Sequence, residues 1–214
     1  MESKKIIITG GATRIGSAIA KSLAGYDVDL TIHFNKSKKL AQKLKIELED
    51  MGSKVHLIKA DLNNTNQLKK IIPYASKKMK GLDCLINNAS MFEKDDLINF
   101  SEKSFLKHIN INLKAPAFLM KDFKKVVKKK DANVINIIDQ RIKKLTPYFF
   151  SYTLSKAALG TLTEIGAMKL APNIRVNAVS PGPTIKNKRQ SDRHFKAQWK
   201  STILEKKVNL SNIC

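Results

Sequence analysis

Short apolar runs alternate along the chain with longer segments that have a helical pattern. Six apolar runs predict strands, at residues 6–8, 29–34, 55–60, 82–86, 133–138 and 174–179. The segments between them predict helices at residues 14–25, 37–51, 66–80, 101–129 and 151–170. Nearly every strand residue is apolar, which is typical of strands that helices cover on both faces of a sheet.

This alternation predicts an α/β fold built on a doubly wound parallel sheet of the Rossmann type. Parallel strands that follow one another need a crossover, and such crossovers are right-handed in nearly all proteins. No linker rich in Pro, Gly or Ser, no internal repeat and no low-complexity segment divides the chain. We therefore predict a single domain over residues 1–214.

Residues 186–214 differ from the rest of the chain. This segment is polar, contains the only tryptophan, Trp199, and shows no pattern of a seventh strand. We interpret it as a tail that acts as a lid over the substrate. A sheet that ended on its sixth strand with an open edge would be exposed to mispairing.

The composition limits the class of protein. Of the 214 residues, 43% are hydrophobic and 27% are charged, which is a usual mix for a globular chain with one substantial core. This excludes a wholly disordered, collagen-like or disulfide-stapled protein. No run approaches the ~20 apolar residues of a membrane span, and the first residues lack the apolar core of a signal peptide. We therefore predict a cytoplasmic protein with no membrane partner.

The formal net charge of +22 has to be divided by residue type before it can be interpreted. Lysine supplies 35 of the 40 basic residues and arginine only 5. Groups that read bases or bind phosphates in a bidentate way are mostly arginines, and these lysines are spread from end to end. The densest run, at residues 124–125 and 128–130, falls at the predicted end of a helix, where cations suit the helix dipole. We predict no specific nucleic-acid partner, with binding through the lysine surplus as an alternative.

Metal ligands are not apparent in the sequence. Cys84 and Cys214 form no C-x-x-C pair, and the four histidines are scattered. Cys84 lies in an apolar run and is expected to be a small buried side chain. We predict no metal site.

A glycine-rich turn, TGGATRIG at residues 9–16, follows the first strand and opens the first helix. Gly10 and Gly11 permit the tight turn, Gly16 allows close packing of the helix, and the helix N-terminus points its N–H groups at a pyrophosphate. Arg14 stands where the common pattern has a glycine, and its guanidinium could approach a phosphate or an acidic substrate edge. The turn predicts a dinucleotide site, although a turn of this kind also occurs without a ligand.

The end of the second strand indicates which dinucleotide is bound. Proteins that bind NAD place an acid here for the ribose 2′-hydroxyl, whereas NADP binders use basic groups for the 2′-phosphate. The segment His33-Phe34-Asn35-Lys36-Ser37 has no acid and is followed by two further lysines. This favours NADP(H), with a solvated lysine loop as the alternative.

Two further motifs follow the fourth strand and open the last long helix. Asn87-Asn88-Ala89-Ser90 lies at the carboxyl end of its strand, where ligands bind in such sheets, and Asn87 could also serve only to tie neighbouring strands together. Phe92 follows, either as a stacking platform for a flat ring or as an ordinary buried aromatic. Tyr152 and Lys156 are four residues apart, so they share one helix face, and an ammonium beside a phenol favours proton transfer near neutral pH.

Taken together and in this order, these motifs resemble the short-chain dehydrogenase/reductase family over the whole chain. TGGATRIG matches its cofactor turn, NNAS its N-N-A-G element, and YTLSK its Y-x-x-x-K pair. Within the family the chain is most similar to pteridine reductases and dihydromonapterin-reductase-like proteins. Three departures from the common pattern point there: Arg14, Ser90 followed by Phe92, and Asp139 where most members have the catalytic Ser.

The resemblance implies a role for each matching residue. Tyr152 is the expected proton donor, Lys156 lowers its pKa and holds the nicotinamide ribose, Asp139 orients substrate and acid, and Asn112 keeps a water relay in place. The expected substrate-contacting residues are Arg14, Ser90, Phe92, Asp139 and Tyr152. The expected cofactor-binding residues are Gly10, Thr13, Arg14, Ile15, His33, Phe34, Asn35, Lys36, Ser37, Asp61, Leu62, Asn88, Ala89, Ser90, Lys156, Pro181 and Gly182.

The implied activity is an NADPH-dependent reduction of a C=N bond in a small dihydropterin-like substrate. The alternatives are reduction of a carbonyl such as a 3-oxoacyl thioester or a sugar-like substrate, and a non-catalytic nucleotide-binding scaffold. The family is also expected to form homodimers or homotetramers. Its members continue with another helix and a final strand, so we expect that this chain is incomplete at its C-terminal end.

Overall fold

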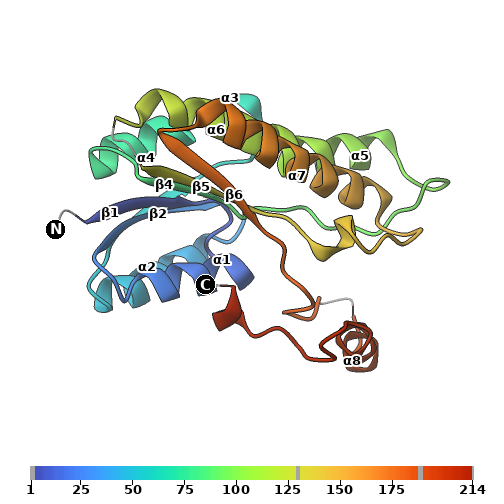
Figure 1. The fold of residues 1–214 in the computed structure, drawn as a ribbon. Helices are drawn as coiled ribbons and strands as arrows, with labels where there is room; N and C mark the ends of the chain where they lie inside the picture. The colour runs from blue at the N-terminus through green and yellow to red at the C-terminus, as the bar shows by residue number, and fades with distance from the viewer. Residues whose placement is uncertain (1–2, 129–130, 188–189, 214) are drawn as a thin grey trace.

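A computed structural model describes residues 3–128, 131–187 and 190–213. Its centre is a six-stranded sheet in the order β3-β2-β1-β4-β5-β6 (Figure 1). All five pairs of neighbouring strands are parallel. The strands are β1 (Lys4–Ile8), β2 (Val28–Phe34), β3 (Lys54–Lys59), β4 (Cys84–Asn87), β5 (Ala132–Ile137) and β6 (Ile174–Val179). The predicted doubly wound parallel sheet is therefore confirmed.

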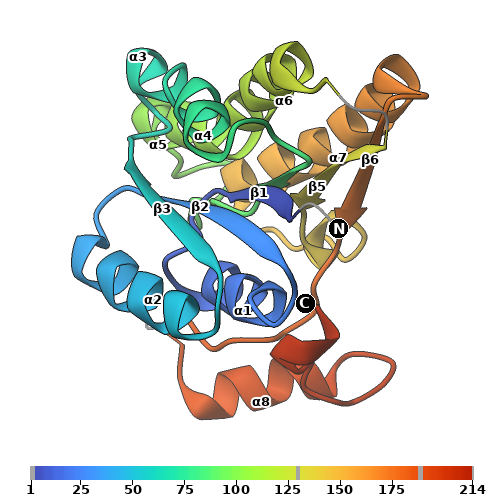
Figure 2. The same cartoon turned by 90° about the vertical axis from the view of Figure 1, so that its left-hand side faces the viewer.

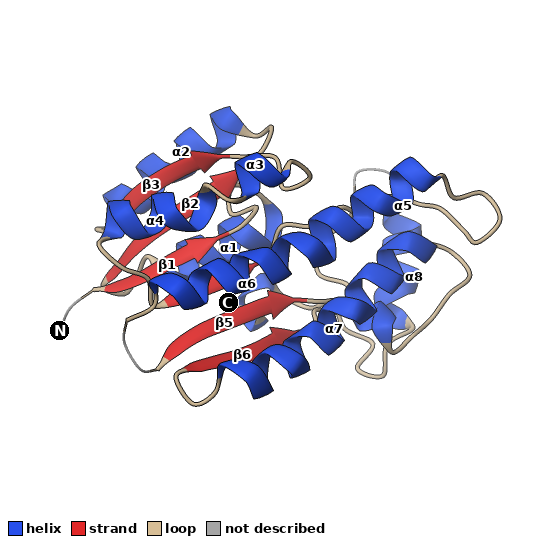
Figure 3. Ribbon diagram, turned by 90° about the horizontal axis from the view of Figure 1, so that it is seen from above, coloured by secondary structure: helices blue, strands red, loops and turns tan. Residues whose placement is uncertain are grey.

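Helices cover both faces of this sheet. One face carries α1 (Arg14–Leu23) and α2 (Lys38–Asp50), and the other carries α4 (Ile71–Met79), α6 (Ala115–Val126) and α7 (Phe150–Leu170) (Figures 2 and 3). Two short helices, α3 (Thr65–Leu68) and α5 (Glu102–Ile109), lie on the same side as α4 and α6. The last helix, α8 (Asp192–Lys200), lies below α1 and α2 in Figure 2.

Successive residues of the central strands point to opposite faces and so divide the core in two. Ile7 and Leu85 pack with Phe123 and other residues of α4 and α6 on one face. Ile8 and Ile32 pack with residues of α1 and α2 on the other. Burial on both faces explains why the strands are almost wholly apolar in sequence.

The long helix predicted at residues 101–129 is confirmed over residues 102–126, with one difference. A π-helical turn, Asn110–Lys114, lies within it between α5 and α6, and the helix ends at Val126. A π-turn widens the helix by one residue, and such turns are frequent at functional sites. The run predicted at residues 66–80 is likewise divided, into α3 and α4. Lys129, Lys130 and Cys214, which the sequence analysis discussed, lie outside the described residues.

The chain after β6 runs away from the sheet and passes beneath α1 (Figure 1). It forms α8 and then a 3₁₀ turn, Leu210–Asn212, that packs against α1. Within the described residues there is no seventh strand, and β6 pairs with β5 alone. None of the helices in the described ranges is long and apolar enough to cross a membrane.

Candidate active site

The glycine turn lies at the carboxyl end of β1, where connections leave the sheet toward opposite faces and ligands of such folds bind. Gly10 has a φ of +60°, and a Cβ there would lie 2.9 Å from the Cα of Ala89. A Cβ on Gly16 would collide with the carbonyl oxygen of Gly10 and lie 2.5 Å from Asn88 Nδ2. These positions therefore require glycine because the turn packs directly against the loop after β4.

Hydrogen bonds fix this loop to the turn. The Thr9 hydroxyl oxygen accepts from the backbone N–H groups of Asn88 at 3.0 Å and Ala89 at 3.1 Å. Asn88 Nδ2 donates to the carbonyl oxygens of Thr9 at 2.9 Å and Gly10 at 3.1 Å. Asn87 instead donates from Nδ2 to Asn136 Oδ1 at 2.8 Å in the core, which supports its structural interpretation.

His33 supports the turn from behind. Its Nδ1 accepts from the Gly10 N–H at 3.1 Å, and its Nε2 lies 3.0 Å from the Ala60 carbonyl oxygen, so Nε2 carries the proton. The ring is 2% exposed, and burial lowers the pKa of His33 to about 4. The imidazole is therefore neutral at physiological pH and joins β1, β2 and the end of β3.

The ends of β2 and β3 meet beside this histidine. The Ala60 N–H donates to the Phe34 carbonyl oxygen at 3.0 Å, which places Asp61 and Leu62 next to the segment 33–37. Phe34 and Leu62 are buried, whereas Lys36 is exposed with no acid in its segment. The structure thus brings together the residues predicted for the adenine side, and the Lys36 ammonium and the Ser37 hydroxyl belong to the same segment.

The predicted catalytic group assembles between β5 and α7. Tyr152 Oη donates to Asp139 Oδ2 at 2.7 Å, and Lys156 Nζ donates to the Ile137 carbonyl oxygen at 2.6 Å. Tyr152 is 5% exposed and Lys156 is 2% exposed. Their helix face is the one that the four-residue spacing predicted, and β5 brings Asp139 to it.

Burial and the carboxylate control the protonation of this group. The pKa of Tyr152 lies well above 10 because the phenol is buried, stands close to the Asp139 charge and donates a hydrogen bond to that carboxylate. The expectation of a lowered Tyr152 pKa is therefore wrong for the protein alone. Burial also lowers the pKa of Lys156 to about 8, against the opposing charge of Asp139. Tyr152 consequently holds its proton, and Lys156 is an ammonium near neutral pH.

Asn112, which lies in the π-turn, holds the loop after β4 against α7. Its Oδ1 accepts from the Met91 N–H at 2.8 Å and from the Ser90 hydroxyl at 3.3 Å. Its Nδ2 donates to the Met91 carbonyl oxygen at 3.0 Å and the Ser155 hydroxyl at 2.9 Å. The side chain is fully buried and connects the loop after β4 to α7. The predicted water relay is not tested by these contacts.

Phe92 forms one side of an aromatic wall. Its ring stacks on Phe149 with centroids 4.5 Å apart and planes at 5°, and it meets the Tyr152 ring edge-on at 4.6 Å. Arg141 lies over the wall, with its guanidinium carbon 4.5 Å from the Phe149 centroid and 5.8 Å from that of Phe92. Neither Phe149 nor Arg141 was predicted from the sequence.

Asp95 holds this wall against the start of α7, and it too was missed. Its carbonyl oxygen accepts from the Phe149 N–H at 2.7 Å, and its Oδ1 accepts from the Ser151 N–H at 3.2 Å. Phe149 has a φ of +61°. The signals available were an arginine two residues after Asp139 and a phenylalanine three residues before Tyr152, and neither follows a periodic pattern.

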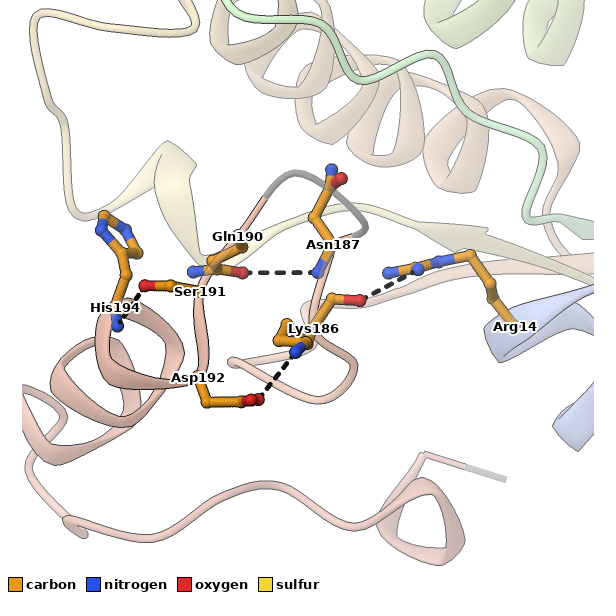
Figure 4. A network of polar contacts seen from close by, with 7 residues as sticks. All are labelled: Arg14, Lys186, Asn187, Gln190, Ser191, Asp192 and His194. Atoms are coloured by element: carbon orange, nitrogen blue, oxygen red, sulfur yellow. Dashed lines mark hydrogen bonds and ion pairs between the residues drawn. The ribbon is translucent and has the colours of Figure 1, made fainter.

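Arg14 contacts the C-terminal segment rather than a neighbouring side chain (Figure 4). Its guanidinium donates to the carbonyl oxygens of Ile185 at 3.1 Å and Lys186 at 3.3 Å. Farther along, Lys186 Nζ pairs with Asp192 Oδ1 at 2.7 Å. Pro181 and Gly182 precede this region and lie beside Gln140, whose N–H donates to the Pro181 carbonyl oxygen at 3.4 Å. Arg14 therefore joins the glycine turn to the segment that leaves β6.

The residues present fit a dinucleotide. The glycine turn leads into the N-terminus of α1, and its N-cap residue Thr13 makes no side-chain hydrogen bond to the first N–H groups of that helix, which leaves them for a phosphate. Among the described residues, the buried Lys156 ammonium donates only to Ile137, which leaves N–H groups for a ribose hydroxyl. In the part of the chain that the structure describes, no cluster of His, Cys, Asp or Glu could hold a metal ion.

Solved structures that are similar to this chain contain NADP, which agrees with a dinucleotide site. A crystal structure of FolM alternative dihydrofolate reductase 1 from Brucella canis, complexed with NADP, is 37% identical, with a TM-score of 0.92 over 97% of this chain and 82% of that one. A short chain dehydrogenase from Burkholderia cenocepacia, also with NADP, is 26% identical, with a TM-score of 0.93 over 99% and 87%.

Curated sequences include matches as similar as the Burkholderia structure. Galactitol 2-dehydrogenase from Agrobacterium fabrum is 26% identical over 192 residues, which are 85% of this chain and 71% of that protein. Residues 4–197 match the family described as short chain dehydrogenase. With the glycine turn, the buried Tyr152–Lys156 pair and this match across most of its length, the chain belongs to the short chain dehydrogenase family.

Proposed function

We propose that this protein is an NADPH-dependent reductase whose substrate is a flat, polar heterocycle of the dihydropterin kind. The observation that carries the proposal is the carboxylate of Asp139, bonded to the Tyr152 hydroxyl at 2.7 Å beside a wall of stacked aromatic rings. A carboxylate at this position suits a ring that has N–H donors, whereas a nonpolar ketone offers no partner for it.

The cofactor side of the proposal is NADP(H). Gly10 and Gly16 let the turn bind the pyrophosphate. Lys36 and Ser37 bind the 2′-phosphate, and Lys156 binds the nicotinamide ribose. When bound, the reduced nicotinamide supplies the hydride. The NADP complexes of the Brucella and Burkholderia proteins support this choice of cofactor.

The chain's own chemistry is the transfer of a proton. Hydride addition to the carbon of a C=N bond leaves an electron pair on nitrogen, and Tyr152 Oη gives its proton to that nitrogen as the N–H bond forms. The Lys156 ammonium, four residues along the same helix face, stabilises the phenolate that results. Solvent then restores the phenol proton. Asp139 accepts hydrogen bonds from the phenol and from ring N–H groups, and so orients both partners.

Phe92 and Ser90 contribute the shape of the pocket in this proposal. Phe92 offers an aromatic face to a flat ring, and Ser90 stands between Asn112 and the phenol. The Brucella canis relative is described as an alternative dihydrofolate reductase, and dihydrofolate contains a dihydropterin ring. That relative therefore supports a pterin substrate for this chain.

The test is a comparison of substrates under one set of conditions. Loss of NADPH absorbance is followed with dihydrobiopterin, dihydromonapterin and a 3-oxoacyl thioester, and we expect turnover of the two pterins. Turnover of the thioester alone would replace the proposal with a carbonyl reductase. NADPH binding without turnover of any of them would instead favour a nucleotide-binding scaffold.

Assembly and location are further parts of this proposal. Leu154, Ile165 and Met168 of α7 are large apolar side chains with exposed fractions of 44%, 54% and 74%. A second copy of the chain would cover such a surface, so we propose a homodimer or homotetramer. Light scattering of the purified protein measures this directly. We also propose a cytoplasmic location.

A further inference from the structure

Arg141 is fixed beside the catalytic carboxylate by its own backbone. It lies in the 3₁₀ turn Gln140–Ile142 that follows Asp139. Its N–H donates to Asp139 Oδ1 at 2.8 Å, while Tyr152 Oη donates to Oδ2 of the same carboxylate. Both oxygens of Asp139 therefore have donors, and neither donor is the Arg141 guanidinium.

The guanidinium instead lies on the aromatic wall. Its central carbon lies over the Phe149 ring, 4.5 Å from the centroid, and Nη1 donates to the Thr146 hydroxyl at 3.3 Å. Within the described residues this is the one hydrogen bond of a group that has five N–H donors. Arg141 also forms no ion pair with any carboxylate that the structure describes. A half-buried cation thus presents unused donors at the edge of the substrate wall.

No acid of this rim pairs with the guanidinium in the part of the chain that the structure describes. Asp95 and Asp96 belong to the loop that contacts Phe149 and Tyr148, and neither forms an ion pair with Arg141. Asp139 accepts from Tyr152 Oη and from the Arg141 N–H, and the guanidinium does not donate to it. The guanidinium is therefore available to a negatively charged group of a substrate.

The choice of residue is informative in a chain with 35 lysines and 5 arginines. Lysine serves for surface charge almost everywhere else. A planar guanidinium can stack on a ring and still offer a fork of two parallel N–H groups at its edge, which an ammonium cannot do. That fork matches the two oxygens of a carboxylate or phosphate.

We propose that Arg141 binds an oxyanion on the side chain of the heterocyclic substrate and so makes the enzyme prefer acidic substrates over neutral ones with the same ring. This inference rests on the proposed function for the identity of the ring. It assigns Arg141 to substrate selection and leaves proton transfer to Tyr152. The oxyanion is either a carboxylate or a phosphate, and the substrates below distinguish the two.

The test compares Arg141→Gln and Arg141→Lys with wild type on three substrates. These are dihydrobiopterin, which has a neutral side chain, dihydrofolate, which has two carboxylates, and dihydroneopterin monophosphate. We expect Arg141→Gln to raise KM roughly ten- to a hundredfold for whichever acidic substrate is natural, with kcat and the KM of dihydrobiopterin changed by less than about twofold. Arg141→Lys should give an intermediate KM, because it keeps the charge and loses the fork.

A matched control removes a different cation from the same rim. Lys94→Gln has the same change in charge at a residue that also lies over an aromatic ring, and it should leave all three KM values unchanged. Equal losses for neutral and acidic substrates in Arg141→Gln would show that Arg141 only maintains the wall. No loss for any substrate would also overturn the inference.

Equilibrium binding separates this inference from the proposed function. Folate and biopterin do not need to react, so their affinities for the NADP⁺ complex can be measured by calorimetry. If wild type reduces no dihydropterin, the proposed function fails. The role of Arg141 then survives only if Arg141→Gln weakens the binding of folate and leaves biopterin binding unchanged, and equal affinities in wild type and variant overturn it.

Discussion

The carboxyl edge of the sheet and the C-terminal segment at residues 181–213 are built in different ways. At the sheet edge, the side chains of Asn112, His33 and Asn88 each make two or more hydrogen bonds, and those of Tyr152 and Lys156 are buried. Among the described residues after Thr184, Phe195 is the one buried large apolar residue, while Ile203 and Leu204 are 102% and 78% exposed.

The attachments of the two regions differ in the same way. Strand pairing and core packing fix the sheet edge, whereas the C-terminal segment is attached largely through surface polar contacts. Examples are Arg14 with the carbonyls of residues 185 and 186, and Lys144 Nζ with the Ser201 carbonyl oxygen at 3.0 Å. The sheet edge is therefore held by buried contacts, whereas the attached segment has few of them and is expected to open more easily.

The largest expected effect is at the phenol of Tyr152. Tyr152→Phe removes the proposed proton donor and leaves Asp139 Oδ2 without the hydrogen bond from the phenol. We expect kcat to fall by a factor of about 10² to 10⁴ with little change in NADPH affinity. Steady-state kinetics and a binding titration measure the two effects. Tyr148→Phe is the matched control, because Tyr148 is about half exposed and lies outside the catalytic group; a similar kcat for both variants would contradict the assignment.

The next effect concerns the close contact between the glycine turn and the β4 loop. Gly16→Ala places a Cβ against the Gly10 carbonyl oxygen and Asn88, and neither can move without disturbing the turn. We expect a loss of about 2–3 kcal/mol in the free energy of unfolding, together with weakened NADPH binding.

Gly25→Ala provides the control for this prediction. Its φ is not positive, and the Ser22 carbonyl oxygen, 3.9 Å away, is the nearest atom to a Cβ built there. Denaturant unfolding should show this variant to be as stable as wild type or more so. Equal stability of the Gly16→Ala and Gly25→Ala variants would mean that the turn is less tightly packed than the contacts indicate.

The sequence was sufficient for the sheet edge because its signals are local. Apolar strands, a glycine turn between strand and helix, and a four-residue Tyr–Lys spacing each follow from one segment at a time. Phe149, Arg141 and Asp95 were missed because their roles depend on two loops, after β4 and after β5, meeting in space. The π-turn at Asn112 also escaped notice, since it interrupts a helix whose apolar pattern continues. Nothing in the spacing of Arg14 indicated that its partners would be backbone carbonyls 171 and 172 residues away.

The loss of folding stability at acid pH should depend on His33. Its pKa of about 4 in the folded protein lies below the ordinary value of 6.5, so the unfolded chain binds a proton more readily between these pH values. The stability from this group is therefore present above pH 6.5 and is lost as the pH falls toward 4, by as much as about 3 kcal/mol.

A variant without the titrating ring isolates this contribution. His33→Asn keeps an acceptor for the Gly10 N–H and should remove most of the decline between pH 6.5 and 4, as measured by urea unfolding at several pH values. His56→Asn is the graded control, because partial burial lowers the pKa of His56 in the same direction at a less buried site. A wild-type decline that persists unchanged in His33→Asn would assign the acid sensitivity to other groups.

The smallest expected effect is at Arg14, and this prediction tests how the C-terminal segment is attached. Arg14 is exposed, so Arg14→Ala should change the free energy of unfolding by only about 1 kcal/mol, while the segment after Thr184 loses its contact with the glycine turn. Hydrogen exchange of residues 185–187 and 190–213 should then be faster in the variant, with exchange in β1 and β4 unchanged. Lys144→Ala, which removes the contact with Ser201, should accelerate exchange only around α8.

The cofactor supplies the decisive comparison for this last prediction. If Arg14 also serves the pyrophosphate, as its place in the turn predicts, then a phosphate competes with the Ile185 and Lys186 carbonyls for one guanidinium. Addition of NADPH should then alter exchange at residues 185–187 in wild type and leave it unaltered in Arg14→Ala. The same change in both proteins would mean that the segment responds to the cofactor without Arg14, and that the two regions are coupled through Pro181 and Gly182 instead.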